Sequence, residues 1–262
     1  MKTLNLVCAA LLAAFSAGCA AVGGLADLTV YDRSEGRSLP VYWHEGRAWV
    51  VGKPGNEYQI TLRNRQGEDL LAVLSVDGVN AISGETASVQ QSGYVLAPRG
   101  ALEVKGWRKD LARTAAFYFT TLADSYAART GRPDNVGAIG VALYRRKAPE
   151  PVSIAPSAPI GGQLGQLSKR ERSDAAAESV ARSAESQLGT GHGRTETSHA
   201  RTVGFERATR EPAETLVIYY DSYSNLLARG IVPQPPIAPC AIPCGRRPAP
   251  NPFPGFVPDP PA

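Results

Sequence analysis

Residues 71–84, LAVLSVDGVNAISG, decide the fold class of this chain. The run that begins at Leu70 and ends at Val76 is apolar at nearly every position, which is typical of an inner strand covered on both faces. Asp77-Gly78 then predicts a tight turn, because an Asp side chain can bond nearby backbone and glycine adopts positive φ. A ligand-contacting loop is the alternative, and under it Asp77 and Asn80 are the candidate contacts.

The rest of residues 27–147 also consists of short strand signals separated by turn residues. Glu45-Gly46 predicts a two-residue hairpin turn, and the segment 57–63 alternates apolar and polar residues with the period of a half-buried strand. Strands at spacings of about 8–12 residues are typical of all-β domains. We therefore expect a mainly all-β fold, an antiparallel β-sandwich or jelly-roll-like domain over 27–147, with one or two short helices.

Two similar stretches predict turns from strand to helix. Asp124-Ser125-Tyr126 leads to Gly131, and Asp221-Ser222-Tyr223 follows the apolar run 216–220 and leads to Gly230. Asp124 is the expected cap of the first helix, and glycine closes each helix. The shared text is too short for a duplication, so we interpret it as the same capping chemistry used twice.

The second half of the chain divides by composition. Residues 148–187 read as a Pro/Ala-rich linker with a marginal helix, residues 188–232 as a C-terminal strand-helix arm that packs back on the β-domain or on a partner, and residues 233–262 as a Pro-rich disordered tail. Within the arm, GTGHG at 189–193 lacks the spacing of a dinucleotide-binding loop, and we expect a flexible bend.

The N-terminus predicts export. Residues 1–19 have Lys2, an apolar stretch and small residues before Cys19, the pattern of a signal peptide. Ala17-Gly18-Cys19 resembles the lipobox of bacterial lipoproteins, which implies a lipid on Cys19, a short tether over 20–26 and an outer-membrane location facing the periplasm. Ordinary cleavage, giving a soluble periplasmic protein, is the alternative.

The remaining expectations concern cysteines, charge and binding residues. In an oxidising compartment we expect a disulfide between Cys240 and Cys244, with free thiols as the alternative, and the partners of a zinc site are missing nearby. A formal charge of +4 without a basic stripe argues against nucleic acid. Trp107 and Arg108 suit either a sugar or planar ligand or plain packing. We expect no metal and no cofactor, and solvated histidines at His44, His192 and His199.

The segments VLSVDGVNAISG, SGYVLAP, GWRK, DSYAARTGRPDNVGAIGVALY and LGTGHGRTE resemble an uncharacterised family of exported bacterial proteins, often lipoprotein-like. The resemblance covers roughly residues 27–233 and implies a compartment but no activity.

Local motifs of known enzymes are missing from the sequence, so we lean against an enzyme. The leading hypothesis is an envelope-anchored module that binds a protein or a cell-wall glycan. The first alternative is an envelope-polymer hydrolase that uses Asp77 or Glu85 with His192 or His199. The second is a structural assembly subunit.

Overall fold

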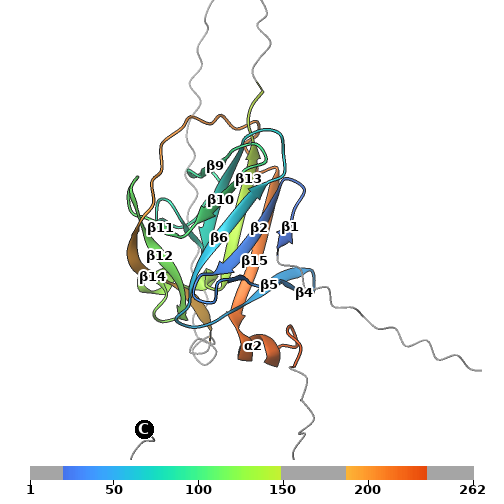
Figure 1. Cartoon of the computed structure of the whole chain (residues 1–262), viewed down its shortest axis with the longest axis vertical. Helices are drawn as coiled ribbons and strands as arrows, with labels where there is room; N and C mark the ends of the chain where they lie inside the picture. Colours follow the sequence, from blue (N-terminus) through green and yellow to red (C-terminus); the bar gives the residue numbers. More distant parts are fainter. Residues whose placement is uncertain (1–19, 149–186, 235–262) are drawn as a thin grey trace, which may run out of the picture. The chain divides into compact units, whose positions relative to one another are not determined.

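The computed structural model describes residues 20–148 and 187–234, and these form two β-sheets (Figure 1). All described strand pairs are antiparallel except β5 with β15, which is parallel. The first sheet runs in the order β1-β2-β6-β12-β11, with β3 on β2, β10 on β6 and β14 on β12. The second runs β4-β5-β15-β13-β7-β8, with β9 on β7.

The strands of the first sheet are β1 (Ala21–Val22), β2 (Ala26–Asp32), β3 (Arg37–Ser38), β6 (Glu57–Asn64), β10 (Ala101–Val104), β11 (Gly106–Arg108), β12 (Arg113–Thr121) and β14 (Leu188–Thr197). Those of the second are β4 (Tyr42–His44), β5 (Arg47–Gly52), β7 (Leu70–Val76), β8 (Val79–Asn80), β9 (Tyr94–Leu96), β13 (Ala138–Arg145) and β15 (Glu214–Ser222). Three short helical elements complete the fold, namely α1 (Tyr126–Arg129), the 3₁₀ turn η1 (Pro133–Asn135) and α2 (Tyr223–Ala228). The mainly-β prediction is confirmed.

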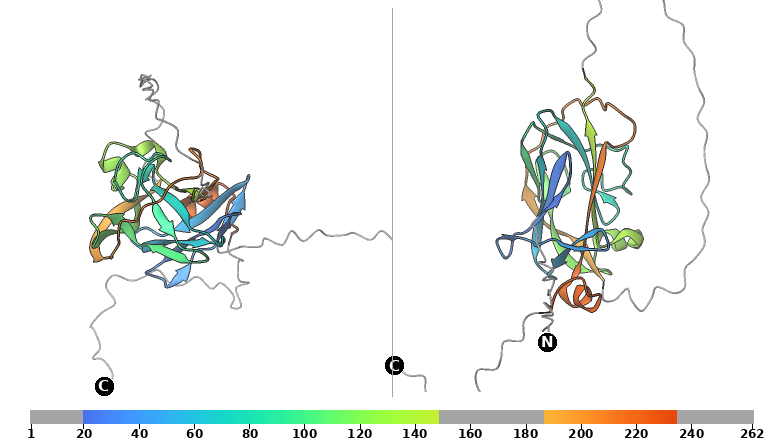
Figure 2. Two further views of the ribbon diagram at one scale, coloured as in Figure 1. Left: turned by 90° about the horizontal axis from the view of Figure 1, so that it is seen from above. Right: turned by 90° about the vertical axis from the view of Figure 1, so that its right-hand side faces the viewer.

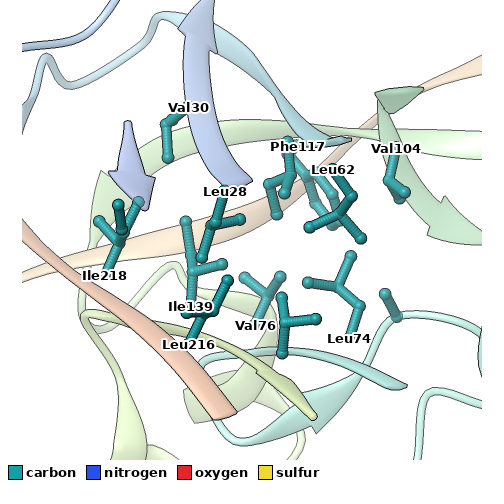
Figure 3. Packing of buried hydrophobic residues seen from close by; sticks show 14 of the residues in the cluster. Leu28, Val30, Leu62, Leu74, Val76, Val104, Phe117, Ile139, Leu216 and Ile218 are labelled. Carbon is teal, nitrogen blue, oxygen red and sulfur yellow. The ribbon is translucent and has the colours of Figure 1, made fainter. Parts of the chain in front are cut away.

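The core lies between the two sheets. Figure 2 shows the sheets as two layers, with β2 in one and β15 in the other. Leu28, Leu62 and Phe117 from the first sheet point toward Val76 and Ile139 from the second, and all five side chains are fully buried (Figure 3). Burying one such side chain stabilises the fold by about 1.5–3 kcal/mol, so the facing layers supply most of the driving force.

β7 is the inner strand that its apolar sequence predicts. It pairs with β13 along its whole length, and with β8 and β9 on its other side. Leu74 packs into the core between the sheets, while Leu71 and Val73 join a second cluster with Tyr144 on the outer face. Both faces of β7 are therefore covered, which explains the unbroken apolar run.

The C-terminal strands belong to the sandwich itself. β14 pairs with β12 over nearly its full length, and β15 lies between β5 and β13 inside the second sheet. The arm packs on the β-domain as predicted, but it does so by completing both sheets. With the exception of Pro233 and Gln234, the described residues belong to one compact unit that ends at Val232.

The GTGHG segment is a strand, so the expected flexible bend is wrong. Its glycines fall on β14 at every second position, and neighbouring groups occupy the space where side chains would stand. A Cβ on Gly191 would lie 2.2 Å from ring atoms of Tyr118 on the paired strand β12. The glycines therefore allow close packing of the neighbouring elements within a regular strand.

Residues 20–26, expected as a tether, are part of the sandwich. β1 pairs with β2, and Ala21, Leu25 and Ala26 are buried. The carboxylate of Glu214 accepts hydrogen bonds from the backbone N–H groups of Gly24 (2.6 Å) and Leu25 (2.7 Å). The sandwich thus includes residues that follow Cys19 closely in the sequence.

The two short helices use the same capping chemistry, as predicted, but the capping residue is serine. The Ser125 hydroxyl accepts a hydrogen bond from the backbone of Ala128 at the start of α1, and Ser222 does the same for Asn225 in α2. Asp124 instead accepts a hydrogen bond from the hydroxyl of Thr121. The linker with its marginal helix and the tail lie, apart from Ala148, Gln187, Pro233 and Gln234, outside the described residues.

Candidate functional site

Asp77 and Gly78 form the predicted tight turn between β7 and β8. Val76 pairs with Val79, and both turn residues have positive φ, 52° for Asp77 and 73° for Gly78. This is the backbone of a two-residue hairpin, and Glu45 and Gly46 adopt it between β4 and β5 (φ 49° and 73°). The turn prediction from sequence is confirmed at both places.

The side chain of Asp77 does not face solvent. Asp77 is fully buried, and its carboxylate accepts hydrogen bonds from the backbone N–H of Gly137 (2.9 Å) and Thr190 (2.7 Å) and from the hydroxyl of Tyr220 (2.6 Å). The expected bond to its own turn is replaced by bonds to three distant segments. Both carboxylate oxygens therefore have partners inside the protein.

A chain of hydroxyl groups continues from Asp77 across the interior. Because the ionised carboxylate only accepts, Tyr220 donates its one hydroxyl proton to Asp77. The Thr190 hydroxyl lies 2.7 Å from the Tyr220 oxygen and 2.6 Å from that of Tyr58. It follows that Thr190 donates to Tyr220 and accepts from Tyr58. Asp77 and Tyr220 belong to the second sheet, Thr190 and Tyr58 to the first, so this chain joins the two layers.

Burial raises the pKa of each ionisable group in this chain of hydrogen bonds. It raises the pKa of Asp77 to about 6, although the hydrogen bonds from Tyr220, Thr190 and Gly137 act in the opposite direction. Burial, with the nearby Asp77 charge, also raises the pKa of Tyr58 and Tyr220 well above the usual value. Both tyrosines are therefore neutral at physiological pH, and Asp77 is the titrating member of the chain.

Asn80 stabilises the loop that follows the turn. Its side-chain oxygen accepts hydrogen bonds from the backbone of Ile82 (2.8 Å) and Ser83 (3.1 Å), and its amide donates to Gln91 (3.1 Å) and to the carbonyl of Ser92 (3.2 Å). Asn80 is buried and all of these partners belong to the loop itself. Its observed contacts are those of a structural turn residue.

Trp107 and Arg108 also have partners within the protein. Trp107 is buried, its indole N–H donates to the carbonyl of Gly191 (3.1 Å), and its ring meets Phe117 edge-on at 5.1 Å. Arg108 donates to the carbonyl and the hydroxyl of Ser198. The partner of Arg108 is thus a serine, and the two side chains connect β11 to β14 and to the segment after it.

The residues that the hydrolase alternative requires do not form one site. Asp77 is buried, whereas Glu85, His192 and His199 are exposed, and no hydrogen bond joins Asp77 to either histidine. Glu85 accepts a hydrogen bond from Gln91 (3.2 Å), and the His192 ring lies 5.6 Å from that of Tyr126. Within residues 20–148 and 187–234, three or more histidine, cysteine or acidic side chains do not gather as a metal site would require. Cys19, Cys240 and Cys244 lie outside this part of the chain.

One exposed surface has the composition of a binding site, and we call it the aromatic edge. It surrounds β4, the edge strand with which the order of the second sheet begins, and consists of Tyr42, Trp43, Arg47, Tyr219 and Arg229 around the buried Trp49. Trp43 is 54% exposed. Such exposure is uncommon for the largest apolar side chain, and it is informative because burial of Trp is the rule.

Pairing of the strands orders the aromatic edge. Tyr42 and Tyr219 both stand beside Trp49 on the outer face of the second sheet, with the Trp49 and Tyr219 rings 5.0 Å apart. The Arg229 guanidinium lies over Trp49 at 4.3 Å and that of Arg47 over Tyr219 at 5.5 Å. Trp43 follows Tyr42 on the strand and so points to the opposite side of β4. The sequence at 39–43 predicts a strand, but it does not predict that the Trp43 side chain is exposed and not buried.

A second exposed feature is a basic hollow beside β1. It has a volume of about 430 Å³ and is lined by Val22, Asp27, Arg63, Asn64, Arg65 and Arg99. These residues come from β1, β2, β6 and the turn before β10. Sequence reasoning missed this site because its arginines are far apart in the chain and form no basic run.

No helix in the described part of the chain is long and apolar enough to cross a membrane. Comparison with known proteins gave no matching family model, no matching curated protein and no matching solved structure, so the resemblance to exported lipoprotein-like proteins stays a prediction.

Proposed function

We propose that this protein is a binding module anchored in the bacterial cell envelope, and that the aromatic edge docks a partner protein. The exposed side chain of Trp43 carries the proposal. Leaving a large apolar ring in water has no benefit for folding, whereas burying it against a partner contributes strongly to affinity.

The composition of the aromatic edge supports a protein partner. Its members are Trp, Tyr and Arg only, the residue types that dominate the energetic centres of protein interfaces. The two arginines lie over aromatic rings, so their side chains are already ordered. Ordering before binding lowers the entropic cost of association.

A cell-wall glycan is the second candidate. The side chains of Tyr42 and Tyr219 are partly exposed on the outer face, and Gly140, on the strand next to that of Tyr219, has open space where a side chain would stand. A flat sheet surface with aromatic rings suits the apolar face of a sugar. The glycan candidate uses the tyrosines of the outer face, whereas Trp43 points to the opposite side of β4, so variants of Trp43 and of the two tyrosines separate the candidates.

The decisive experiment places a photo-crosslinking amino acid at position 43 in intact cells. Leu111, 58% exposed in the turn between β11 and β12, provides the matched control position. A protein captured from position 43 and absent from position 111 supports the proposal. A product consisting of two copies of this chain points instead to an assembly subunit.

The Trp43→Ala variant gives the energetic test. We expect its affinity for the captured partner to fall by at least about 30-fold, the effect of a typical interface hot spot, with the melting temperature unchanged. Leu111→Ala should bind like the wild type. If no protein is captured and purified cell-wall polymer sediments the wild type but not a Tyr42→Ala, Tyr219→Ala variant, the ligand is a glycan.

The anchor is tested separately. We expect the mass of the mature protein to include a lipid on Cys19, and we expect Cys19→Ala to release the protein from the membrane fraction. A mature protein without added lipid would contradict the anchor and leave the test of the aromatic edge intact.

A further inference from the structure

The basic hollow presents positive charge that the fold does not neutralise. Arg65 forms an ion pair with Asp27 (Nη1–Oδ1 3.5 Å) and donates a hydrogen bond to the carbonyl of Gly23 (3.0 Å). The side chains of Arg63 and Arg99 form no ion pair or hydrogen bond with any other residue in the described segments, and both are exposed. Two guanidinium groups are thus available at the rim of one concavity.

The backbone around these arginines is fixed. Arg63 lies in the middle of the first sheet, where β6 pairs with β2 and with β10. The backbone N–H of Arg99 donates to the carbonyl of Gln66 (3.0 Å), and the buried amide of Asn64 donates to the carbonyl of Ala97 (2.9 Å). Each guanidinium group extends from this fixed backbone and can bind phosphate oxygens with two parallel hydrogen bonds.

The closeness of the hollow to Cys19, the proposed lipid anchor, favours a phospholipid headgroup as the ligand. Val22 lines the hollow, and Cys19 comes three residues earlier. Three extended residues span at most about 11 Å. The headgroup layer on each side of a bilayer is about 5–8 Å thick. A lipid on Cys19 would therefore keep Val22, at the edge of the hollow, close to the phospholipid headgroups.

We propose that the basic hollow binds the phosphate of an anionic phospholipid in the membrane to which Cys19 is anchored, with Arg63 and Arg99 as the binding residues. This inference rests on the proposed envelope anchor. Headgroup binding would add a second attachment to the lipid on Cys19. It would also fix how the sandwich is oriented on the membrane, which a single acyl-bearing residue does not do.

The test uses the full-length lipidated protein, purified in a neutral detergent and titrated with short-chain phosphatidylglycerol. The double variant Arg63→Gln, Arg99→Gln removes both charges, and Arg210→Gln, an exposed arginine elsewhere on the protein, is the matched control. We expect the wild type and the control to bind phosphatidylglycerol alike, and the double variant to bind about 30-fold more weakly. Equal melting temperatures will show that all three proteins are folded.

Two further ligands define the source of the phosphate. Phosphatidylcholine, which carries no net charge, should bind much more weakly than phosphatidylglycerol. Equal binding of the two lipids, or unchanged affinity in the double variant, would overturn the proposal. Inorganic phosphate that displaces the lipid at equal concentration would overturn the headgroup as the ligand. Absence of a lipid on Cys19 would instead overturn the anchor, and the mass of the protein shows this independently.

Discussion

The hydroxyl of Tyr220 donates a 2.6 Å hydrogen bond to the carboxylate of Asp77, 143 residues earlier in the chain. Both groups are fully buried, and Thr190 and Tyr58 extend the bond into the opposite sheet. A buried polar chain of this kind contributes to stability only while every member has its partner.

Tyr220→Phe should lower the free energy of unfolding by about 1–3 kcal/mol at pH 7. The substitution removes the hydroxyl donor to Asp77 and the acceptor for Thr190. Urea unfolding measures the change. Tyr219→Phe is the control, because its ring lies on the outer face of the sheet, and it should change stability by less than about 0.5 kcal/mol. Equal effects of the two substitutions would contradict the proposed role of the chain.

Stability should depend on pH through Asp77. Its pKa in the fold is about 6, above the ordinary value of 3.8, so the folded state binds its proton more tightly than the unfolded state does. This contribution to stability is present below about pH 4 and is lost as the pH rises to about 6, by a total of about 3 kcal/mol.

The non-titrating variant Asp77→Asn isolates that effect from the other carboxylates. The difference in unfolding free energy, wild type minus variant, should decrease by about 2 kcal/mol between pH 4 and pH 7. Denaturant unfolding at several pH values measures it. A difference that stays constant over this range would show that Asp77 ionises normally.

Gly191→Ala should destabilise the protein by at least about 1–3 kcal/mol, because the new Cβ would overlap the ring of Tyr118. Gly140→Ala is the matched control in a strand interior, since a Cβ there meets no atom within 4 Å. Replacing glycine by alanine at that open site should be neutral or slightly stabilising. Thermal unfolding compares the two, and adding Tyr118→Ala to Gly191→Ala should recover part of the loss.

Ser125→Ala should cost about 1 kcal/mol, as expected for loss of the hydroxyl that caps α1. Asp124→Ala should cost less than about 0.5 kcal/mol, because Asp124 is exposed and bonds only to Thr121. Chemical denaturation of both variants decides which residue is the cap. A larger loss for Asp124→Ala would restore the assignment made from sequence.

Local patterns were read correctly where neighbouring residues determine the structure. Asp77-Gly78 and Glu45-Gly46 are turns in which glycine, and Asp at the first of them, favours positive φ. Tyr220 could not be identified as the partner of Asp77, since only the complete pairing of β7, β13 and β15 brings them together. The alternating glycines of β14 did carry the period of a strand, but the low strand propensity of glycine concealed it. Both proposed binding surfaces consist of residues distant in sequence.

The parallel pairing of β15 with β5 has a consequence for the order of folding. Ala48 is among the first residues of the sandwich and Ile218 is among the last, yet they are adjacent in the second sheet. Until residues 214–222 are synthesised, β5 and β13 both present unpaired backbone along one edge. Such edges are sites of aggregation. Until β15 has formed, the incomplete chain must be kept from pairing with other chains along these two edges.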